Sequence, residues 1–334
     1  MNFFQKLFSI KPEQEPNRQD SSENDSKQTG STPADYEFET LRDDGIRAMK
    51  MRAFRQAVSC FKGAIDRRDD PEVRSLLAET YLRSGQSREA SELLSRLVEE
   101  IPDSISLWQA LAWAANLNDD AETLERAACR LAVINPDDPN NAYCKARSAY
   151  LRQDYGATLP TLDDLLQAHP DHAGARLLRA QAHDALGQYA EAERDIDQLI
   201  ADGYQGETVS LLKGRLRELQ DDTDGALHVY LDMRERDPFS MAALEHLTDI
   251  YIKTDRSEEA LKLLDEAVDW QPEAPEPYSI RSKARRAAGD DRGAEADLSK
   301  VEELGGTVEQ SPCDRRRLED QLNEEARRRN PFGF

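Results

Sequence analysis

The 334-residue sequence contains few cysteines and no long apolar run. Its four cysteines, Cys60, Cys129, Cys144 and Cys313, are scattered without a CxxC pair. This spacing argues against both a disulfide framework and a zinc site, so we interpret them as ordinary thiols. No stretch approaches the roughly 20 apolar residues that a membrane-spanning helix needs. The first ten residues, MNFFQKLFSI, lack the pattern of a secretory signal, and we expect a cytoplasmic protein.

Positive charge is also scarce in this chain. Lysine and arginine number 44 against 66 aspartates and glutamates, which gives a formal net charge of -22. Because nucleic-acid binding depends on clustered cations that neutralise phosphates, we expect no nucleic-acid partner. The acidic surplus either favours basic or apolar partner segments or only keeps the protein soluble, and composition leaves both interpretations open.

Sequence motifs of catalysis and metal binding are missing as well. No HExxH, GxSxG, GxGxxG or P-loop string occurs, and acidic clusters such as Asp221-Asp222 lack the ligand spacing of a calcium loop. His169 and His172 flank a turn, and we interpret them as exposed turn residues rather than a metal pair. The sequence therefore predicts a protein that is not an enzyme and has no cofactor and no metal.

A 34-residue period is the main pattern that is present. Seven residues follow one another at intervals of 34, and five of them are prolines. The seven are Pro102, Pro136, Pro170, Tyr204, Pro238, Pro272 and Gly306. A period of this length is typical of helical repeat arrays, in which each helix pair buries its apolar face against its neighbours.

Eight units align when Pro102 is numbered as position 32. Position 8 is small in every unit: Gly45, Ala78, Ala112, Ala146, Ala180, Gly214, Thr248 and Ser282. Position 20 is alanine in six units and leucine or threonine in the other two. Its residues are Ala57, Ala90, Leu124, Thr158, Ala192, Ala226, Ala260 and Ala294. Positions 20, 24 and 27 share one face of a helix, and position 8 belongs to the helix before it. Each unit is thus predicted to be a helical hairpin, no alternating run predicts a strand, and the fold class is all-α.

This pattern resembles the tetratricopeptide repeat family over roughly residues 36–310. The fullest matches are the segment AQAHDALGQYAEA, from Ala180 to Ala192, and the unit in which Trp108, Leu111 and Ala112 occupy the family's positions 4, 7 and 8. The resemblance implies a right-handed superhelical solenoid of about eight hairpins that acts as a protein–protein interaction scaffold. It also implies a partner peptide bound in the concave groove.

Position 7 departs from the family's usual leucine in four units, where Lys145, Arg179, Lys213 and Arg281 occupy it. A long aliphatic stem can cover apolar surface while its charge reaches water. We therefore expect these four side chains to lie along the core and to direct their charges into solvent.

The resemblance places the concave surface at positions 2, 5, 9, 12 and 13 of the first helices. The predicted partner-binding residues are Trp113, Asn116, Tyr143, Arg147 and Tyr150, because aromatic and arginine side chains carry much interface energy. The alternative is that Tyr143 and Tyr150 pack between helices.

A clamp for a partner's terminal carboxylates is not supported at this surface. Positions 5 and 9 of the first two units are Arg42, Ile46, Ser75 and Glu79, which lack the necessary lysines and asparagines. An extended or helical peptide held by aromatic anchors fits better.

Segments outside the repeats are predicted at both ends. Residues 11–35 have the composition of a disordered linker. Ahead of them, Phe3, Phe4, Leu7 and Phe8 form an amphipathic N-terminal segment that docks into protein, lies on a membrane surface or stays frayed. The second outcome would make the protein a membrane-surface adaptor, although the acidic body disfavours anionic lipid. Residues 311–330 are predicted to form a capping helix and residues 331–334 a tail, and the oligomeric state is left open.

Overall fold

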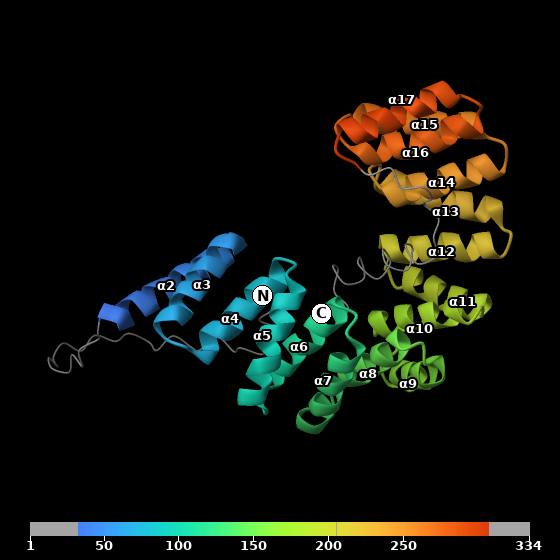
Figure 1. Cartoon of the computed structure of the whole chain (residues 1–334). Coiled ribbons are helices and arrows are strands. Elements are labelled where there is room, and N and C mark those ends of the chain that lie inside the picture. Colours follow the sequence, from blue (N-terminus) through green and yellow to red (C-terminus); the bar gives the residue numbers. More distant parts are fainter. Residues whose placement is uncertain (1–32, 205, 307–334) are drawn as a thin grey trace, which may run out of the picture. The chain divides into compact units, whose positions relative to one another are not determined.

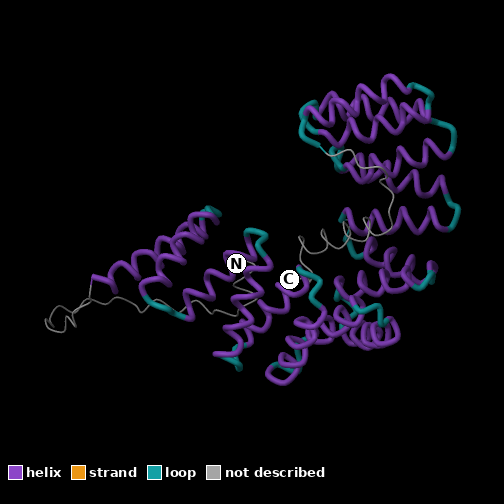
Figure 2. The backbone as a smooth tube through the Cα atoms, viewed as in Figure 1, coloured by secondary structure: helices purple, strands orange, loops and turns teal. Residues whose placement is uncertain are grey.

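The computed structural model describes residues 33–204 and 206–306. In these residues the chain forms sixteen α-helices joined by short turns, and no strand occurs among them (Figure 2). The predicted all-α fold is therefore confirmed. No helix within the described ranges is long and apolar enough to cross a membrane.

The described residues up to Asp171 form one compact unit of four hairpins, coloured blue to green in Figure 1. Successive helices of this unit pack against each other. Its helices are α2 (Pro33–Lys50), α3 (Phe54–Arg67), α4 (Pro71–Arg83), α5 (Ser87–Glu100), α6 (Ile105–Leu117), α7 (Ala121–Ile134), α8 (Pro139–Leu151) and α9 (Tyr155–Ala168).

The described residues from His172 onward form a second compact unit, again of four hairpins (Figure 1). Its helices are α10 (Ala173–Ala185), α11 (Tyr189–Ala201), α12 (Glu207–Leu219), α13 (Thr223–Arg236), α14 (Met241–Lys253), α15 (Ser257–Trp270), α16 (Pro275–Ala287) and α17 (Asp291–Glu303). Each of the eight hairpins coincides with one predicted repeat. The first begins at Pro33, three residues before the predicted boundary at residue 36.

Buried small residues hold the two helices of each hairpin close together. All eight residues at position 20 are fully buried, and all eight at position 8 are buried as well. Glycine stands at position 8 where an aromatic ring stands at position 24: Gly45 lies against Phe61, and Gly214 lies against Tyr230. The size of one side chain is therefore matched to the size of the other.

The turn inside each hairpin contains one residue with a positive φ, always at position 15. Glycine fills it at Gly85, Gly187 and Gly289, with φ of 81°, 72° and 79°. In the other five hairpins a residue other than glycine adopts this conformation, including Asp119 with φ of 53°. The turn geometry is thus more uniform than the sequence at that position.

The expectation that every charged side chain at position 7 points into solvent is wrong for Arg179 and Arg281. Arg179 binds the buried carboxylate of Asp195, and Arg281 binds the buried carboxylate of Asp297. These side chains are held because a carboxylate one helix away offers two acceptors at the right separation for a guanidinium.

Several predictions concern the chain ends and lie outside the described residues. They are the amphipathic segment with Phe3, Phe4, Leu7 and Phe8, the linker before Pro33, the capping helix at 311–330 and the tail at 331–334.

Candidate functional site

The five predicted partner-binding residues lie on two neighbouring first helices of the first unit. Trp113 and Asn116 lie on α6, whereas Tyr143, Arg147 and Tyr150 lie on α8. The two helices contact each other. We call these five residues, together with Asp119 in the turn after α6, the α6–α8 surface.

The start of α8 sets the register of its three side chains. Asp138 is the N-cap and accepts a hydrogen bond from the Asn140 amide at 2.9 Å, and Pro139 follows in the first turn. Tyr143, Arg147 and Tyr150 then follow at intervals of four and three residues, so they share one face of the helix.

Arg147 is the polar centre of the α6–α8 surface and is buried, with 5% of its side chain exposed. Its Nε donates to Asn116 Oδ1 at 3.2 Å, and its Nη2 donates to Asp119 Oδ1 at 3.1 Å. Its Cζ also lies 5.4 Å from the centre of the Tyr150 ring. The guanidinium therefore joins α6 to α8 and is not a free cation.

The aromatic residues of the surface differ in burial. Tyr143 is buried, and this burial raises the pKa of its hydroxyl to about 12, with the nearby Arg147 acting in the opposite direction. Its burial agrees with the alternative that Tyr143 packs between helices. Trp113 and Tyr150 are only half-buried, and Tyr150 lies edge-on to Tyr155 with the ring centres 5.7 Å apart. Trp113 and Tyr150 are therefore more exposed to solvent than Tyr143.

Two acidic side chains belong to this region of the first unit, one on α4 and one in the turn after α6. Glu79 occupies position 9 on α4, the position that Trp113 holds on α6. Burial raises the pKa of the Glu79 carboxyl, and the Arg83 guanidinium 2.6 Å away opposes this rise. Asp119 is the second acidic residue here, and about a third of its side chain is exposed. Sequence reasoning missed Asp119, because only its place in the turn after α6 brings it to Arg147.

The described residues contain no group of three or more histidine, cysteine, aspartate or glutamate side chains that could hold a metal ion. His172 Nδ1 accepts a hydrogen bond from the Ala175 amide at 3.0 Å and so caps α10. Burial raises the pKa of the Cys144 thiol, whereas Cys129 is exposed.

These helical hairpins, repeated with one register of small residues, define a class of protein: an α-helical repeat array that presents side chains of its first helices to partners. A tetratricopeptide repeat model matches residues 48–117 and 149–216, and a second tetratricopeptide repeat model matches residues 211–276. Together they span more than half of the chain. The chain belongs to the tetratricopeptide repeat family, whose members are in general protein–protein interaction scaffolds and typically not enzymes.

Comparison with known proteins gives one distant curated relative. DnaJ homolog subfamily C member 3 from Gallus gallus is 25% identical over 281 residues, which cover 75% of this chain and 55% of that protein. The chain thus spans about half the length of this relative.

Solved structures with similar folds include other repeat proteins. A tetratricopeptide repeat protein from Parabacteroides merdae aligns with a TM-score of 0.46 and 16% identity. The alignment covers 86% of this chain and 99% of that protein's chain. PilF from Pseudomonas aeruginosa aligns with a TM-score of 0.47 and 14% identity, covering 65% of this chain and 100% of its own.

Proposed function

We propose that this protein is a non-enzymatic scaffold that binds a peptide segment of a partner across the α6–α8 surface. The observation that supports this most is the pair of accessible aromatic side chains, Trp113 and Tyr150, on neighbouring first helices. The Arg147 network joins the two helices that carry these rings, because Arg147 on α8 donates to Asn116 on α6 and its Cζ lies 5.4 Å from the centre of the Tyr150 ring. A ring on helices joined in this way loses little conformational freedom when a partner binds.

The charges around these rings indicate the chemistry of the partner. Asp119 carries a partly exposed carboxylate within the α6–α8 surface, and the whole chain has a net charge of -22. A segment with a large apolar or aromatic anchor next to a lysine or arginine complements this surface. Such a segment is extended or helical, as in the known peptide-recognition modes.

Replacing both accessible anchors tests the proposal. In Trp113→Ala/Tyr150→Ala we expect partner affinity to fall at least about thirtyfold, equivalent to about 2 kcal/mol, because truncated aromatic anchors are the costliest losses at interfaces. Arg147 is left in place, since its removal would strand Asn116 and Asp119 and disturb the fold. Affinity capture from native lysate identifies partners by mass spectrometry, and titration with the captured partner measures the change.

Tyr36→Ala is the matched control, because Tyr36 is an exposed aromatic of the same unit and lies on α2. The proposal requires this variant to retain the native partners. Equal capture by the native chain and the double variant would contradict it.

A membrane-surface adaptor is the competing function, and it depends on Phe3, Phe4, Leu7 and Phe8, which lie outside the described residues. We rank it second because no described residue supports it. We also propose a cytoplasmic location, on the sequence pattern alone.

A further inference from the structure

A second surface of the first unit forms a groove of about 850 Å³. It is lined by α7 and α9, by the turn after α7 and by the first half of α8. Small side chains leave this space open: Ala128, Cys129, Ala132, Ala142 and Ala168. We call it the α7–α9 groove, and it shares no lining residue with the α6–α8 surface.

Lys145 lines the α7–α9 groove and is exposed. It occupies position 7, the position at which three other repeats also carry a cation. Among the described residues, Lys145 has neither an ion pair nor a side-chain hydrogen bond. The other three position-7 cations show what such a side chain does when acceptors are present.

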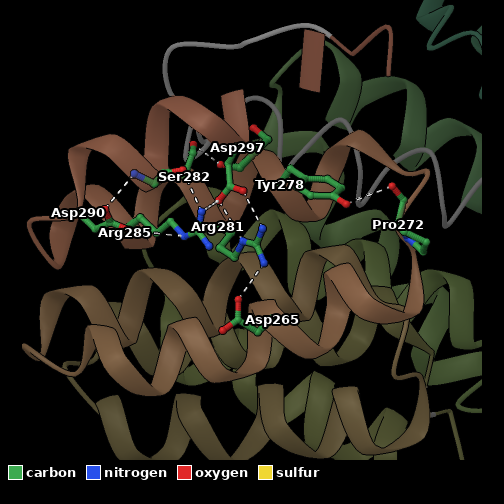
Figure 3. Close-up of polar contacts among 10 residues, drawn as sticks. Asp265, Pro272, Tyr278, Arg281, Ser282, Arg285, Asp290 and Asp297 are labelled. Carbon is green, nitrogen blue, oxygen red and sulfur yellow. Dashed lines mark hydrogen bonds and ion pairs between the residues drawn. The ribbon is translucent and has the colours of Figure 1, made fainter. Parts of the chain in front are cut away.

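Arg281 is the most complete example of a paired cation at position 7 (Figure 3). Its Nε and Nη2 donate to the two carboxylate oxygens of Asp297 at 3.0 and 2.7 Å. Its Nη1 donates to Asp265 Oδ1 at 2.8 Å. Asp297 stands at position 23 of the same repeat, and Asp265 stands at position 25 of the repeat before it. Two fixed positions of the repeat therefore supply the carboxylates.

Arg179 and Lys213 follow the same scheme. Arg179 donates to both oxygens of Asp195, at position 23 of its own repeat, at 2.8 and 2.6 Å. Lys213 Nζ donates at 2.9 Å to Asp197, at position 25 of the repeat before it. Every position-7 cation of the second unit thus has a carboxylate from one of these two positions.

The repeat that contains Lys145 has no carboxylate at either position. Thr161 stands at position 23, and Cys129 stands at position 25 of the preceding repeat. Both residues line the α7–α9 groove beside Lys145. We propose that the α7–α9 groove binds a peptide segment whose aspartate or glutamate pairs with Lys145 and so supplies the carboxylate that the other repeats carry internally.

The remaining charges of the groove restrict the segment further. Asp138 already accepts hydrogen bonds from the Asn140 amide at 2.9 Å and from Gln109 at 3.1 Å. Asp137 and Asp164 are exposed and have no ion-pair partner within the described part of the chain. They repel a purely acidic segment and attract a cation. The occupant is therefore a segment in which one acidic residue has lysine or arginine as a near neighbour, with small apolar side chains against the alanines.

Selection from a displayed library of random octapeptides on the full-length protein tests this assignment. The expected result is enrichment of peptides that combine one aspartate or glutamate with a nearby lysine or arginine. A representative enriched peptide, synthesised and labelled, is then titrated against the variants. Trp113→Ala is expected to bind it with native affinity, which separates this site from the α6–α8 surface.

Two variants make Lys145 unable to pair with the peptide, one by removing its charge and one by giving it a carboxylate partner within the protein. Lys145→Met deletes the charge but keeps a stem of similar length, and Thr161→Asp installs a carboxylate at the position that Asp195 and Asp297 occupy in other repeats. We expect each to weaken peptide binding at least about tenfold, because the pair with the peptide is lost or replaced internally. Thr161→Asn, which adds similar bulk without charge, is expected to stay within about twofold of the native protein.

Three results would overturn the proposal: a selection that enriches no acidic residue, native affinity in Lys145→Met, or equal affinity in Thr161→Asp and Thr161→Asn. Circular dichroism of each variant checks that the helices are retained, so that lost binding is not mistaken for lost folding.

Discussion

At the scale of single residues, position 8 sets how closely the two helices of a hairpin approach each other. A Cβ atom built on Gly45 would lie 2.6 Å from Cε1 of Phe61, which is far inside van der Waals contact. Gly63 lies on the other helix of the same hairpin, where a Cβ would meet Leu41 Cδ1 at an ordinary 3.4 Å. These two glycines therefore have different roles, although both lie within helices.

Gly45→Ala is expected to destabilise the first hairpin by about 1–2 kcal/mol, since overpacking costs more than the gain in helix propensity. Gly63→Ala is the matched control and is expected to be neutral or to stabilise by up to about 1 kcal/mol. Hydrogen exchange of α2 and α3 in the two variants measures the difference. Native protection in Gly45→Ala would show that Phe61 can move aside at no cost.

At the scale of helices, Glu218 joins three elements of the second unit. It lies near the end of α12, where Oε1 accepts a hydrogen bond from the Tyr230 hydroxyl of α13 at 2.8 Å and lies 3.3 Å from His246 Nδ1 of α14. Burial opposes ionisation of this carboxyl. The hydrogen bonds from His246 and Tyr230, together with the charges of His246 and Lys253, outweigh burial and lower its pKa below the ordinary value. The ionised carboxylate is thus favoured by folding.

This lowered pKa predicts how the contribution of Glu218 depends on pH. Glu218 stabilises the folded state fully at pH values above its pKa in the unfolded chain, which is about 4.3. This contribution is lost as the pH falls through the lower pKa of the folded state. Glu218→Gln should therefore lower the free energy of unfolding by about 1–2 kcal/mol at pH 7. The difference from the native protein should shrink below pH 4, in denaturant titrations at several pH values.

Glu235→Gln on α13 provides the comparison, because Glu235 is exposed and makes no ion pair with any described residue. Glu235→Gln should change the free energy of unfolding only slightly at every pH. If Glu218→Gln lowers the free energy of unfolding by the same amount at every pH from 7 to 3, the assignment of the lowered pKa to this carboxyl is contradicted.

At the scale of the whole molecule, stability is expected to be local. Within each unit a helix contacts chiefly its neighbours along the chain, so damage to one hairpin has no direct route to distant ones. The last described hairpin, α16–α17, is tied together by Asp297. This buried carboxylate accepts both contacts from Arg281 and lies 3.1 Å from Arg285 Nη1 (Figure 3).

In Asp297→Asn we expect the free energy of opening the α16–α17 hairpin to fall by about 2 kcal/mol. The substitution removes the buried carboxylate that binds the half-buried guanidinium groups of Arg281 and Arg285, and Arg281 keeps only its contact with Asp265. Hydrogen exchange should show lost protection in α16 and α17 and native protection in α12 and α13. Glu303→Gln, which alters an exposed ion pair with Lys300, should change neither region. Uniform loss of protection over α12–α17 would mean that the second unit unfolds as one cooperative body.

The sequence by itself determined the repeat register, the helical hairpins and the turns, because these follow from local rules of spacing and from residues such as Gly85 and Ala57. It also predicted Trp113 and Tyr150 as partner-binding aromatics from their positions in the repeat, and this stays a prediction. Only the tertiary structure decided which charges are free. Arg147 is buried and bound by Asn116 and Asp119, some thirty residues earlier, and Arg281 is bound by Asp297. Lys145, in contrast, forms no ion pair with any residue that the structure describes. Pairing depends on which side chains from separate helices come within about 3 Å, and one helix's periodicity carries no such information.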